Sequence, residues 1–135
     1  MLARVEPDPN RDPYLLIVDD EPGVLEVARI MASSLGWSPL VANSAEHAFA
    51  LFRDHVDVLG HVLVDLHLPG ANGLELARHL RGLSPAVRIA VMTGDDAAST
   101  APLGEPGLVN AVLSKPFTVG ELDHVFALAA RSRAA

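Results

Sequence analysis

Short apolar runs alternate with amphipathic stretches along most of this chain, and four of the runs end in polar or charged side chains. Apolar runs of about four to eight residues bounded by polar residues are typical of buried strands. These runs and the residues that follow them are Tyr14–Val18 before Asp19 and Asp20, His61–Val64 before Asp65, Val87–Met92 before Thr93, and Val109–Ser114 before Lys115. Because the carboxyl ends of parallel strands share one edge, where ligands bind, we expect the polar residues to form one pocket.

Apolar residues at helical spacing separate these strands and predict the connecting helices. Val24, Val27, Ala28, Met31 and Leu35 fall on one helix face, and the glycine that follows them ends that helix. A further strand is predicted at Trp37–Val41, followed by a helix that begins at an Asn43 or Ser44 cap and ends at about Asp54. Another helix is predicted from about Leu74 to Leu80. The last helix runs from Thr118 to about Ala130, with Thr118 as its cap and Glu121 in capping-box position. Strands that alternate with helices predict an α/β fold with a doubly wound five-stranded parallel sheet.

The segment 94–107, where the fourth helix of this alternation is expected, breaks the pattern. It contains Pro102 and Pro106, each close to a glycine, and few large apolar residues. Proline in a helix interior costs about 3 kcal/mol relative to alanine. We therefore expect a short or irregular fourth helix, with one or two turns at most over about Asp96 to Ala101.

The length and composition of the chain indicate one domain that does not insert into a membrane. The chain has 135 residues, half of them apolar, which is enough for one domain with a buried core. We expect this domain at residues 14–130, between a flexible N-terminal tail at 1–13 and a C-terminal tail at 131–135. No apolar run reaches the roughly 18 residues that a membrane span requires, and the N-terminal segment lacks the apolar core of a signal peptide. We therefore expect a cytoplasmic protein without an output domain of its own.

The charge and cysteine content narrow the classes of partner and site. The formal net charge is −7 and Lys115 is the only lysine, which argues against direct binding to a nucleic-acid backbone. The absence of cysteine excludes a disulfide framework and a thiolate metal site. Carboxylates therefore carry most of the candidate chemistry.

Three carboxylates in the expected pocket, those of Asp19, Asp20 and Asp65, predict a divalent cation. Two carboxylates about 4 Å apart repel by roughly 4 kcal/mol at an effective dielectric constant of 20. Their hard oxygen atoms suit Mg²⁺ or Mn²⁺, which would offset the charge of a phosphoryl group in transfer. Asp65 stands alone at the end of an apolar strand and is the best candidate for a nucleophile that forms an aspartyl phosphate. Lys115 and Thr93 would supply an ammonium and a hydroxyl for the phosphoryl oxygens.

Four motifs together resemble those of a known family. They are Asp19-Asp20-Glu21 after the first strand, Asp-x-x-x-Pro-Gly-x-x-Gly from Asp65 to Gly73, Thr93-Gly94 after the fourth strand, and Lys115-Pro116-Phe117 after the fifth. Over about residues 14–130 the chain resembles the receiver domain of two-component response regulators, in a stand-alone single-domain form. The resemblance implies a flavodoxin-like sheet in the order 2-1-3-4-5.

The resemblance also implies a function and a role for each site residue. Asp65 would take a phosphoryl group from the phosphohistidine of a sensor histidine kinase or a histidine phosphotransfer protein, and the chain would signal by contact with an unknown downstream protein. Such a protein is not an enzyme, except toward its own phosphorylation and dephosphorylation. The resemblance also implies that Asp20 binds Mg²⁺ directly, that Asp19 binds it through water, and that the backbone carbonyl of His67 completes the metal site. It further implies that Thr93 carries the switch hydroxyl and that the peptide bond between Lys115 and Pro116 is cis.

One position departs from the family pattern. Receivers commonly carry tyrosine or phenylalanine three residues before the lysine, where this chain has Val112. Valine cannot make the usual ring movement into the space that the switch hydroxyl leaves. We therefore hypothesise that the signal is an ordering of segment 94–107 when Thr93 engages the phosphoryl group. In receivers the positions of His67 and Asp95 flank the water path to the phosphoryl group. Here these two residues either set the phosphoryl lifetime or are simply exposed loop residues.

Some further residues have a simpler interpretation. On the first helix, Leu25 and Ile30 flank the core stripe, where they either form an apolar docking edge for a kinase helix or are merely partly buried. The remaining histidines show no spacing typical of a ligand set, and we interpret them as surface or strand-edge residues: His47, His55, His61, His79 and His124.

Three other classes of protein stay open. An aspartate-nucleophile phosphatase would carry a second aspartate two residues after Asp65, where this chain has His67. A flavin-binding protein of flavodoxin type would need a hydroxyl-rich first loop, where this chain has acids at 19–21. A receiver-shaped scaffold that acts without phosphorylation is disfavoured by the complete residue set and kept open by Val112. Uptake of one phosphate from a small acyl phosphate donor would separate these classes.

Overall fold

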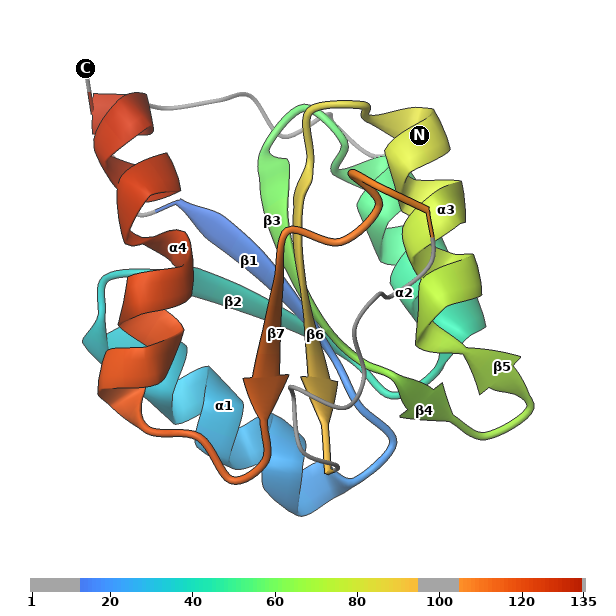
Figure 1. Ribbon diagram of the computed structural model, residues 1–135, viewed down its shortest axis with the longest axis horizontal. Helices are drawn as coiled ribbons and strands as arrows, with labels where there is room; N and C mark the ends of the chain where they lie inside the picture. The colour runs from blue at the N-terminus through green and yellow to red at the C-terminus, as the bar shows by residue number, and fades with distance from the viewer. Residues whose placement is uncertain (1–12, 95–104, 135) are drawn as a thin grey trace.

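The computed structural model of this chain describes residues 13–94 and 105–134, which form a parallel sheet covered by helices (Figure 1). The sheet strands are β1 (Tyr14–Val18), β2 (Ser38–Ala42), β3 (Leu59–Asp65), β6 (Arg88–Thr93) and β7 (Ala111–Ser114). The helices are α1 (Pro22–Ser34), α2 (Ala45–Asp54), α3 (Gly73–Leu83) and α4 (Val119–Ala134). The five strands lie in the order β2-β1-β3-β6-β7, which confirms the predicted flavodoxin-like order 2-1-3-4-5.

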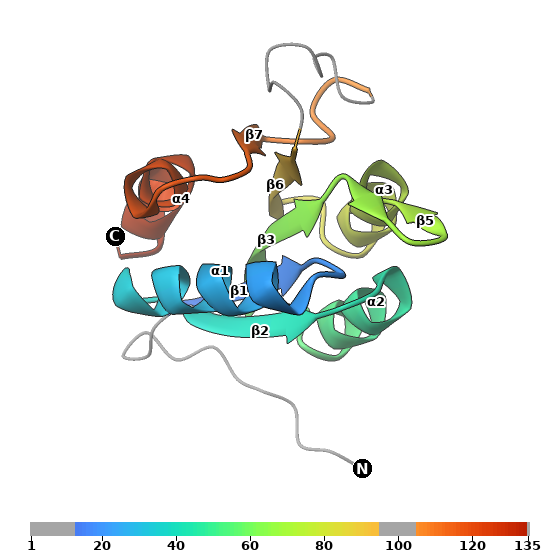
Figure 2. The ribbon, with the colours of Figure 1, turned by 90° about the horizontal axis from the view of Figure 1, so that it is seen from below.

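The helices cover the sheet in pairs, with α1 and α4 on one face and α2 and α3 on the other (Figure 2). Leu16 and Val62 pack in the same core cluster as Phe52 of α2, whereas Ile17 and Leu63 pack with residues of α1 and α4. Strands buried on both faces have nearly continuous apolar sequences, as in β1 and in Val62–Val64 of β3. This burial fixes the strand register and therefore the places where the strands end.

Local side-chain signals set the starts of the helices. Ser44 Oγ accepts a hydrogen bond from His47 N at 3.2 Å, which confirms the predicted cap of α2. Thr118 Oγ1 accepts from Glu121 N at 3.1 Å, and Glu121 Oε1 accepts from Thr118 N at 2.9 Å, which confirms the capping box before α4. α1 begins before its apolar stripe, at Pro22, because the fixed φ of proline suits the first helical turn.

Several element ends differ from the sequence prediction. α4 continues to Ala134, so the predicted end at about Ala130 is wrong and the helix extends into the predicted C-terminal tail. Residues 131–134 contain no glycine or proline that would end a helix. The other shifts are small: α3 covers Gly73–Leu83 instead of about Leu74–Leu80, β2 covers Ser38–Ala42 instead of Trp37–Val41, and β7 begins at Ala111 instead of Val109.

A short hairpin follows β3 and contains the Pro-Gly of the motif that begins at Asp65. β4 (His67–Leu68) pairs antiparallel with β5 (Ala71–Asn72), and the chain turns between them with Gly70 at φ +66°. The side chain of Asn72 then accepts a hydrogen bond from Leu74 N at 2.7 Å and caps α3. The hairpin therefore joins the end of β3 directly to the start of α3.

Two arginines of α3 hold the chain where it returns toward β7. Arg81 Nη2 donates to Leu108 O at 2.7 Å, and the same side chain donates to Val87 O at 3.0 Å. Arg78 Nε lies 3.0 Å from Glu105 Oε1, with both side chains largely exposed. The approach to β7 is therefore attached to α3 as well as to the sheet.

His61 is buried, so its interpretation as a surface or strand-edge residue is wrong. It lies on the central strand β3 and is 3% exposed. Its ring packs edge-on against Trp37, with centroids 4.7 Å apart, and against Phe126 of α4 at 5.4 Å. The strand is therefore buried from His61 to its end at Asp65. The other histidines agree with the prediction, since His47, His79 and His124 are exposed and His55 is half-buried.

Part of the sequence prediction lies outside the described residues. This part comprises the tail over residues 1–12, the turns at about Asp96 to Ala101, and Asp95. Within residues 13–94 and 105–134, no helix combines the length and apolar character needed to cross a membrane.

Candidate functional site

Four neighbouring strands end at one edge of the sheet and bring the predicted polar residues together. Asp19 follows β1, Asp65 ends β3, Thr93 ends β6 and Lys115 follows β7. Asp19, Asp65 and Thr93 are buried, and Lys115 is half-buried. The strand register therefore assembles one polar site from residues that are far apart in the sequence, as the apolar runs predict.

The ammonium of Lys115 lies between two carboxylates. Its Nζ is 2.8 Å from Asp19 Oδ2 and 3.2 Å from Asp65 Oδ2. The backbone supports this position, because Lys115 N donates a hydrogen bond to Thr93 O at 2.7 Å. The peptide bond from Lys115 to Pro116 is cis, as expected. A positive charge is thus held within reach of an oxygen atom bound to Asp65.

Burial and neighbouring charges act on Asp65 in opposite directions. Burial, followed by the charge of Asp19, raises the pKa of the Asp65 carboxyl above its usual range. The His67 N–H, 3.2 Å from Asp65 Oδ1, and the Lys115 ammonium offset part of that rise in pKa. Burial alone would lower the pKa of Lys115, but the carboxylates of Asp19 and Asp65 outweigh it and raise that pKa. Lys115 is therefore positively charged at neutral pH.

The site has the donor chemistry of a hard divalent cation. One carboxylate oxygen from each of Asp19, Asp20 and Asp65 lies within 4.8 Å of the other two. Asp20 is exposed, which leaves an open side for water or a bound group. Lys115 offsets only one of the three carboxylate charges, so the remaining negative potential favours a cation. These residues therefore fit Mg²⁺ or Mn²⁺.

Gly73, the last residue of the Asp-x-x-x-Pro-Gly-x-x-Gly motif, explains why that motif ends in glycine. A Cβ on Gly73 would overlap the backbone carbonyl oxygen of Asp65 and would lie 3.0 Å from Leu66 Cα. Gly73 N also donates to Leu66 O at 2.9 Å. The start of α3 is therefore packed directly on the backbone that carries Asp65, a contact that sequence reasoning did not identify.

A comparison with known families identifies the chain. The family model described as the response regulator receiver domain matches residues 15–127. The chain belongs to the response regulator receiver family. Curated relatives of this receiver domain include the autoinducer 1 sensor kinase/phosphatase LuxN of Vibrio campbellii, 31% identical over 86% of this chain and 13% of its own length. The response regulator MprA of Mycobacterium leprae is 34% identical over 80% of this chain and 46% of its own length. This chain thus spans less than half of these relatives.

The solved structures give the same fold for this receiver domain. A response regulator receiver domain protein from Clostridium thermocellum superposes with a TM-score of 0.82 at 21% identity, covering 90% of this chain and 96% of its own. At this identity the likeness concerns the fold alone. It agrees with the sheet order and with the placement of helices on both faces of the sheet.

Val112 of the receiver domain lies on the edge strand β7, where the family commonly has an aromatic residue. It pairs with Val91 of β6 and is half-buried. It also lines a surface hollow of about 430 Å³ together with Thr118, Glu121 and His124. The proposed ordering of segment 94–107 in place of the ring movement stays a prediction, as does the effect of His67 on phosphoryl lifetime.

An apolar groove adjoins the acidic site of the receiver domain along α1. It has a volume of about 380 Å³ and is lined by Gly23, Val24, Val27, Ala28 and Met31 of α1 and by Lys115–Phe117. Val27 is 52% exposed, so its assignment to the buried stripe is wrong, and Ile30 is 55% exposed. Leu25 is half-buried against the core. The exposed apolar surface of α1 is therefore formed by Val27 and Ile30 rather than by Leu25 and Ile30.

Proposed function

We propose that this receiver domain takes a phosphoryl group from a phosphohistidine onto Asp65 and signals by contact with another protein. The observation that carries the proposal is the Lys115 ammonium, which lies between the buried carboxylates of Asp19 and Asp65. An ammonium in this position binds phosphoryl oxygens as a point charge. The hydroxyl of Thr93, at the neighbouring strand end, is the expected second donor.

In the proposed transfer, a carboxylate oxygen of Asp65 attacks phosphorus while the phosphorus–nitrogen bond to the donor imidazole breaks. Lys115 exchanges its contact with the Asp65 carboxylate for a phosphoryl oxygen and retains Asp19 as a partner. The cation would be held by Asp20, Asp65 and the backbone carbonyl of His67, with Asp19 acting through water. When bound, Mg²⁺ or Mn²⁺ offsets the charge on the phosphoryl oxygens.

The proposed phosphodonor is a sensor histidine kinase or a histidine phosphotransfer protein that meets the domain at the α1 groove. This groove is mostly apolar and is lined by both Val27 and Lys115, so a helix seated in it would bring its imidazole close to Asp65, which Lys115 contacts. We place this exchange in the cytoplasm. The domain acts only on its own phosphorylation and dephosphorylation, and an unknown downstream protein receives the signal.

Intact-mass measurement after incubation with Mg²⁺ and acetyl phosphate tests the proposal. We expect a gain of one phosphate that is lost in Asp65→Asn and after chelation of the divalent cation. The gain should persist in Asp123→Asn, a control that removes an exposed carboxylate of α4. A folded wild-type chain that gains no phosphate, or an equal gain in Asp65→Asn, contradicts the proposal.

A receiver-shaped scaffold that acts without phosphorylation is the second candidate, and Val112 at the position of the usual aromatic ring favours it. Amide exchange across residues 94–107, measured with and without a bound phosphoryl mimic, separates the two functions. Slower exchange with the mimic supports a phosphorylation switch, and equal exchange supports the scaffold.

A further inference from the structure

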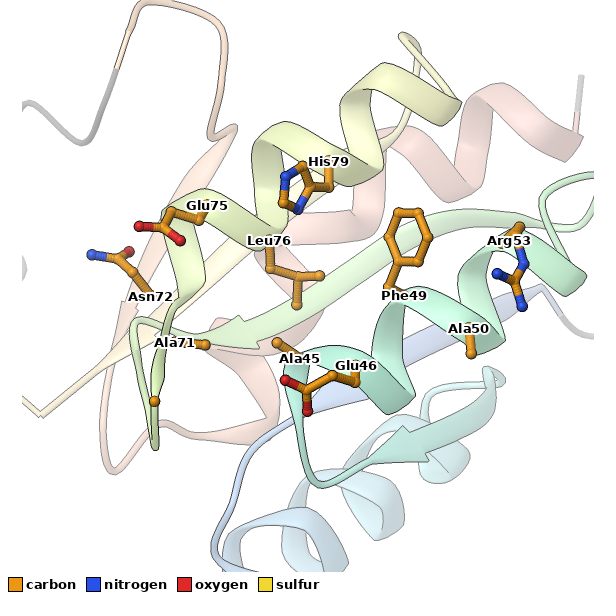
Figure 3. A pocket seen from close by; sticks show the side chains of 11 residues that line it. Ala45, Glu46, Phe49, Ala50, Arg53, Ala71, Asn72, Glu75, Leu76 and His79 are labelled. Atoms are coloured by element: carbon orange, nitrogen blue, oxygen red, sulfur yellow. The ribbon is translucent and has the colours of Figure 1, made fainter.

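A groove between α2 and α3 lies on the face of the sheet opposite α1, away from the proposed phosphodonor surface (Figure 3). It is open to solvent and has a volume of about 540 Å³. Its apolar lining comes from Ala45, Phe49 and Ala50 of α2, Ala71 of β5 and Leu76 of α3. An apolar floor between two helices has the shape that accepts the apolar face of a third helix.

Phe49 is the large apolar side chain of this groove. Its ring is half-buried and packs edge-on against the ring of His79, with centroids 6.2 Å apart. The guanidinium carbon of Arg53 lies 6.0 Å from the centre of the same ring. Figure 3 shows Phe49 projecting from α2 into the space between these two residues. A ring held in place offers contact area at little cost in conformational entropy, which is typical of binding anchors.

Charged residues lie toward opposite ends of the groove. α2 and α3 each follow a strand of a parallel sheet, so both begin at the edge that carries Asp65. Glu46 and Glu75 lie in the first turns of these helices, whereas Arg53 lies in the last turn of α2 and His79 lies beyond the midpoint of α3. All four side chains are exposed and line the groove. The groove therefore runs from an acidic end at Glu46 and Glu75 to an end that carries the Arg53 guanidinium, which also lies 3.4 Å from the exposed Asp54 carboxylate.

We propose that this groove binds an amphipathic helix of a partner protein, which lies antiparallel to α2 and α3. Helices commonly carry acids in the first turn and bases in the last turn. In the antiparallel orientation, the acids of the partner helix meet Arg53, and its bases meet Glu46 and Glu75. The opposed helix dipoles favour the same orientation.

The size of the groove sets the length of the bound segment. From Ala45 to Arg53 the helix α2 advances eight steps of about 1.5 Å, or about 12 Å, which corresponds to about two turns of a bound helix. Apolar residues of the partner at positions i, i+4 and i+7 share one helix face and contact Phe49 and Leu76. Phosphoryl transfer to Asp65 is not needed for this binding.

Two synthetic helices of about 15 residues, each cross-linked to hold its conformation, test the proposal. Both carry leucine at i, i+4 and i+7. The matched peptide has acids in its first turn and bases in its last, and the reversed peptide has these charges exchanged. When they are titrated into the isotope-labelled full chain, the matched peptide should shift amide signals of α2, β5 and α3. It should bind at least about fivefold more tightly than the reversed peptide, since contacts with two or three charged side chains differ.

Variants of the chain then test the charge matching and the anchor. In the double variant Glu46→Lys, Arg53→Glu, the preference should invert, because two exposed charges of the groove are exchanged. Phe49→Ala, with its fold checked by thermal unfolding, should weaken both peptides. Val119→Ser, which removes an exposed apolar side chain of α4, should change neither affinity.

Three outcomes overturn the proposal. The first is equal affinity of the two peptides for the wild-type chain, and the second is a set of signal changes confined to α1 or α4. The third is a wild-type dimer, seen by sedimentation, that the double variant abolishes, because this result would show that the groove binds a second copy of the chain. Phosphate uptake is measured separately on the same variants, so a failure here is distinguishable from a failure of the proposed function.

Discussion

Among single residues, Lys115 decides the electrostatic balance of the site. Asp19 is fully buried and Asp65 is 5% exposed, so water screens their mutual repulsion poorly. The lysine contacts both carboxylates from the end of a different strand. Lys115, or a bound cation in its place, therefore offsets the repulsion between these two acids.

We predict that Lys115→Met lowers the free energy of unfolding by about 2 kcal/mol at pH 7, because two buried acids lose their cation. Urea unfolding measures this loss. Added Mg²⁺ should stabilise the variant more than the wild type. Arg88→Met is the control, since it removes an exposed cation and should change stability by at most about 0.5 kcal/mol. A loss in the control as large as that in Lys115→Met would contradict this explanation.

The raised pKa of Asp65 predicts a pH dependence of stability. The folded chain binds a proton on the Asp65 carboxyl more tightly than the unfolded chain does. The stabilisation of the folded state by this proton is therefore complete below the pKa of Asp65 in the unfolded chain, and it is lost as the pH rises through the pKa in the folded chain. Asp65→Asn mimics the protonated form and should be more stable than the wild type at pH 7. The difference should shrink as the pH falls toward the ordinary range of an aspartate.

Urea unfolding at a series of pH values tests this dependence on Asp65. The exposed Asp123→Asn substitution provides the comparison and should show no such convergence with the wild type. A stability difference between Asp65→Asn and wild type that stays constant with pH would argue against a buried acid at this site.

At the scale of elements, the start of α3 fixes the backbone around Asp65. The hairpin β4–β5 brings the chain back so that Gly73 packs on the carbonyl of Asp65. The end of β3, which carries the proposed phosphoacceptor, is therefore positioned by its contact with the start of α3 as well as by its neighbouring strands in the sheet.

Two glycines of α3 give a matched test of this contact. Gly73→Ala should destabilise the chain by about 1–3 kcal/mol and reduce phosphate uptake, because its Cβ meets backbone that cannot move away. Gly82→Ala places a Cβ in open space on the same helix and should stabilise the chain by up to about 1 kcal/mol. Thermal unfolding and the intact-mass assay measure both effects, and equal behaviour of the two variants would count against the contact.

The two arginines of α3 provide a second comparison. Arg81→Met should cost about 2 kcal/mol, because the carbonyls of Leu108 and Val87 lose their donor in a partly buried setting. Arg78→Met breaks only an exposed ion pair with Glu105 and should cost about 0.5 kcal/mol or less. Urea unfolding measures the free energy of unfolding of both variants. A larger loss of stability in Arg78→Met than in Arg81→Met would contradict this explanation.

The elements show what a sequence can predict. Apolar runs and caps such as Ser44 are local signals, so they predicted the strands and the caps of α2 and α4. The order of the strands in the sheet was predicted from the resemblance to receiver domains. The burial of His61 depends on Trp37 and Phe126, which come from other parts of the chain, so the strand pattern alone did not show it. The short hairpin after β3 has too few residues for a periodic pattern.

At the scale of the whole molecule, the acidic site at the strand ends and the α2–α3 groove differ in how far the sequence predicts them. The acidic site gathers at strand ends, where topology alone places Asp19, Asp65 and Lys115 together, so the sequence predicted it. The α2–α3 groove arises between helices whose contacts a sequence pattern does not specify, and no motif marks it. Two partners bound on opposite faces would therefore meet the domain without competing for the same residues.

The position of the only lysine has a practical consequence for handling this protein. Reagents that acylate amines, including common dyes, cross-linkers and coupling surfaces, have one side-chain target, and that target lies between Asp19 and Asp65. Labelling of the lysine side chain therefore alters the acidic site itself, whereas labelling through introduced cysteines leaves it intact. The same property makes the extent of acylation at Lys115 a direct measure of how often its ion pairs are open.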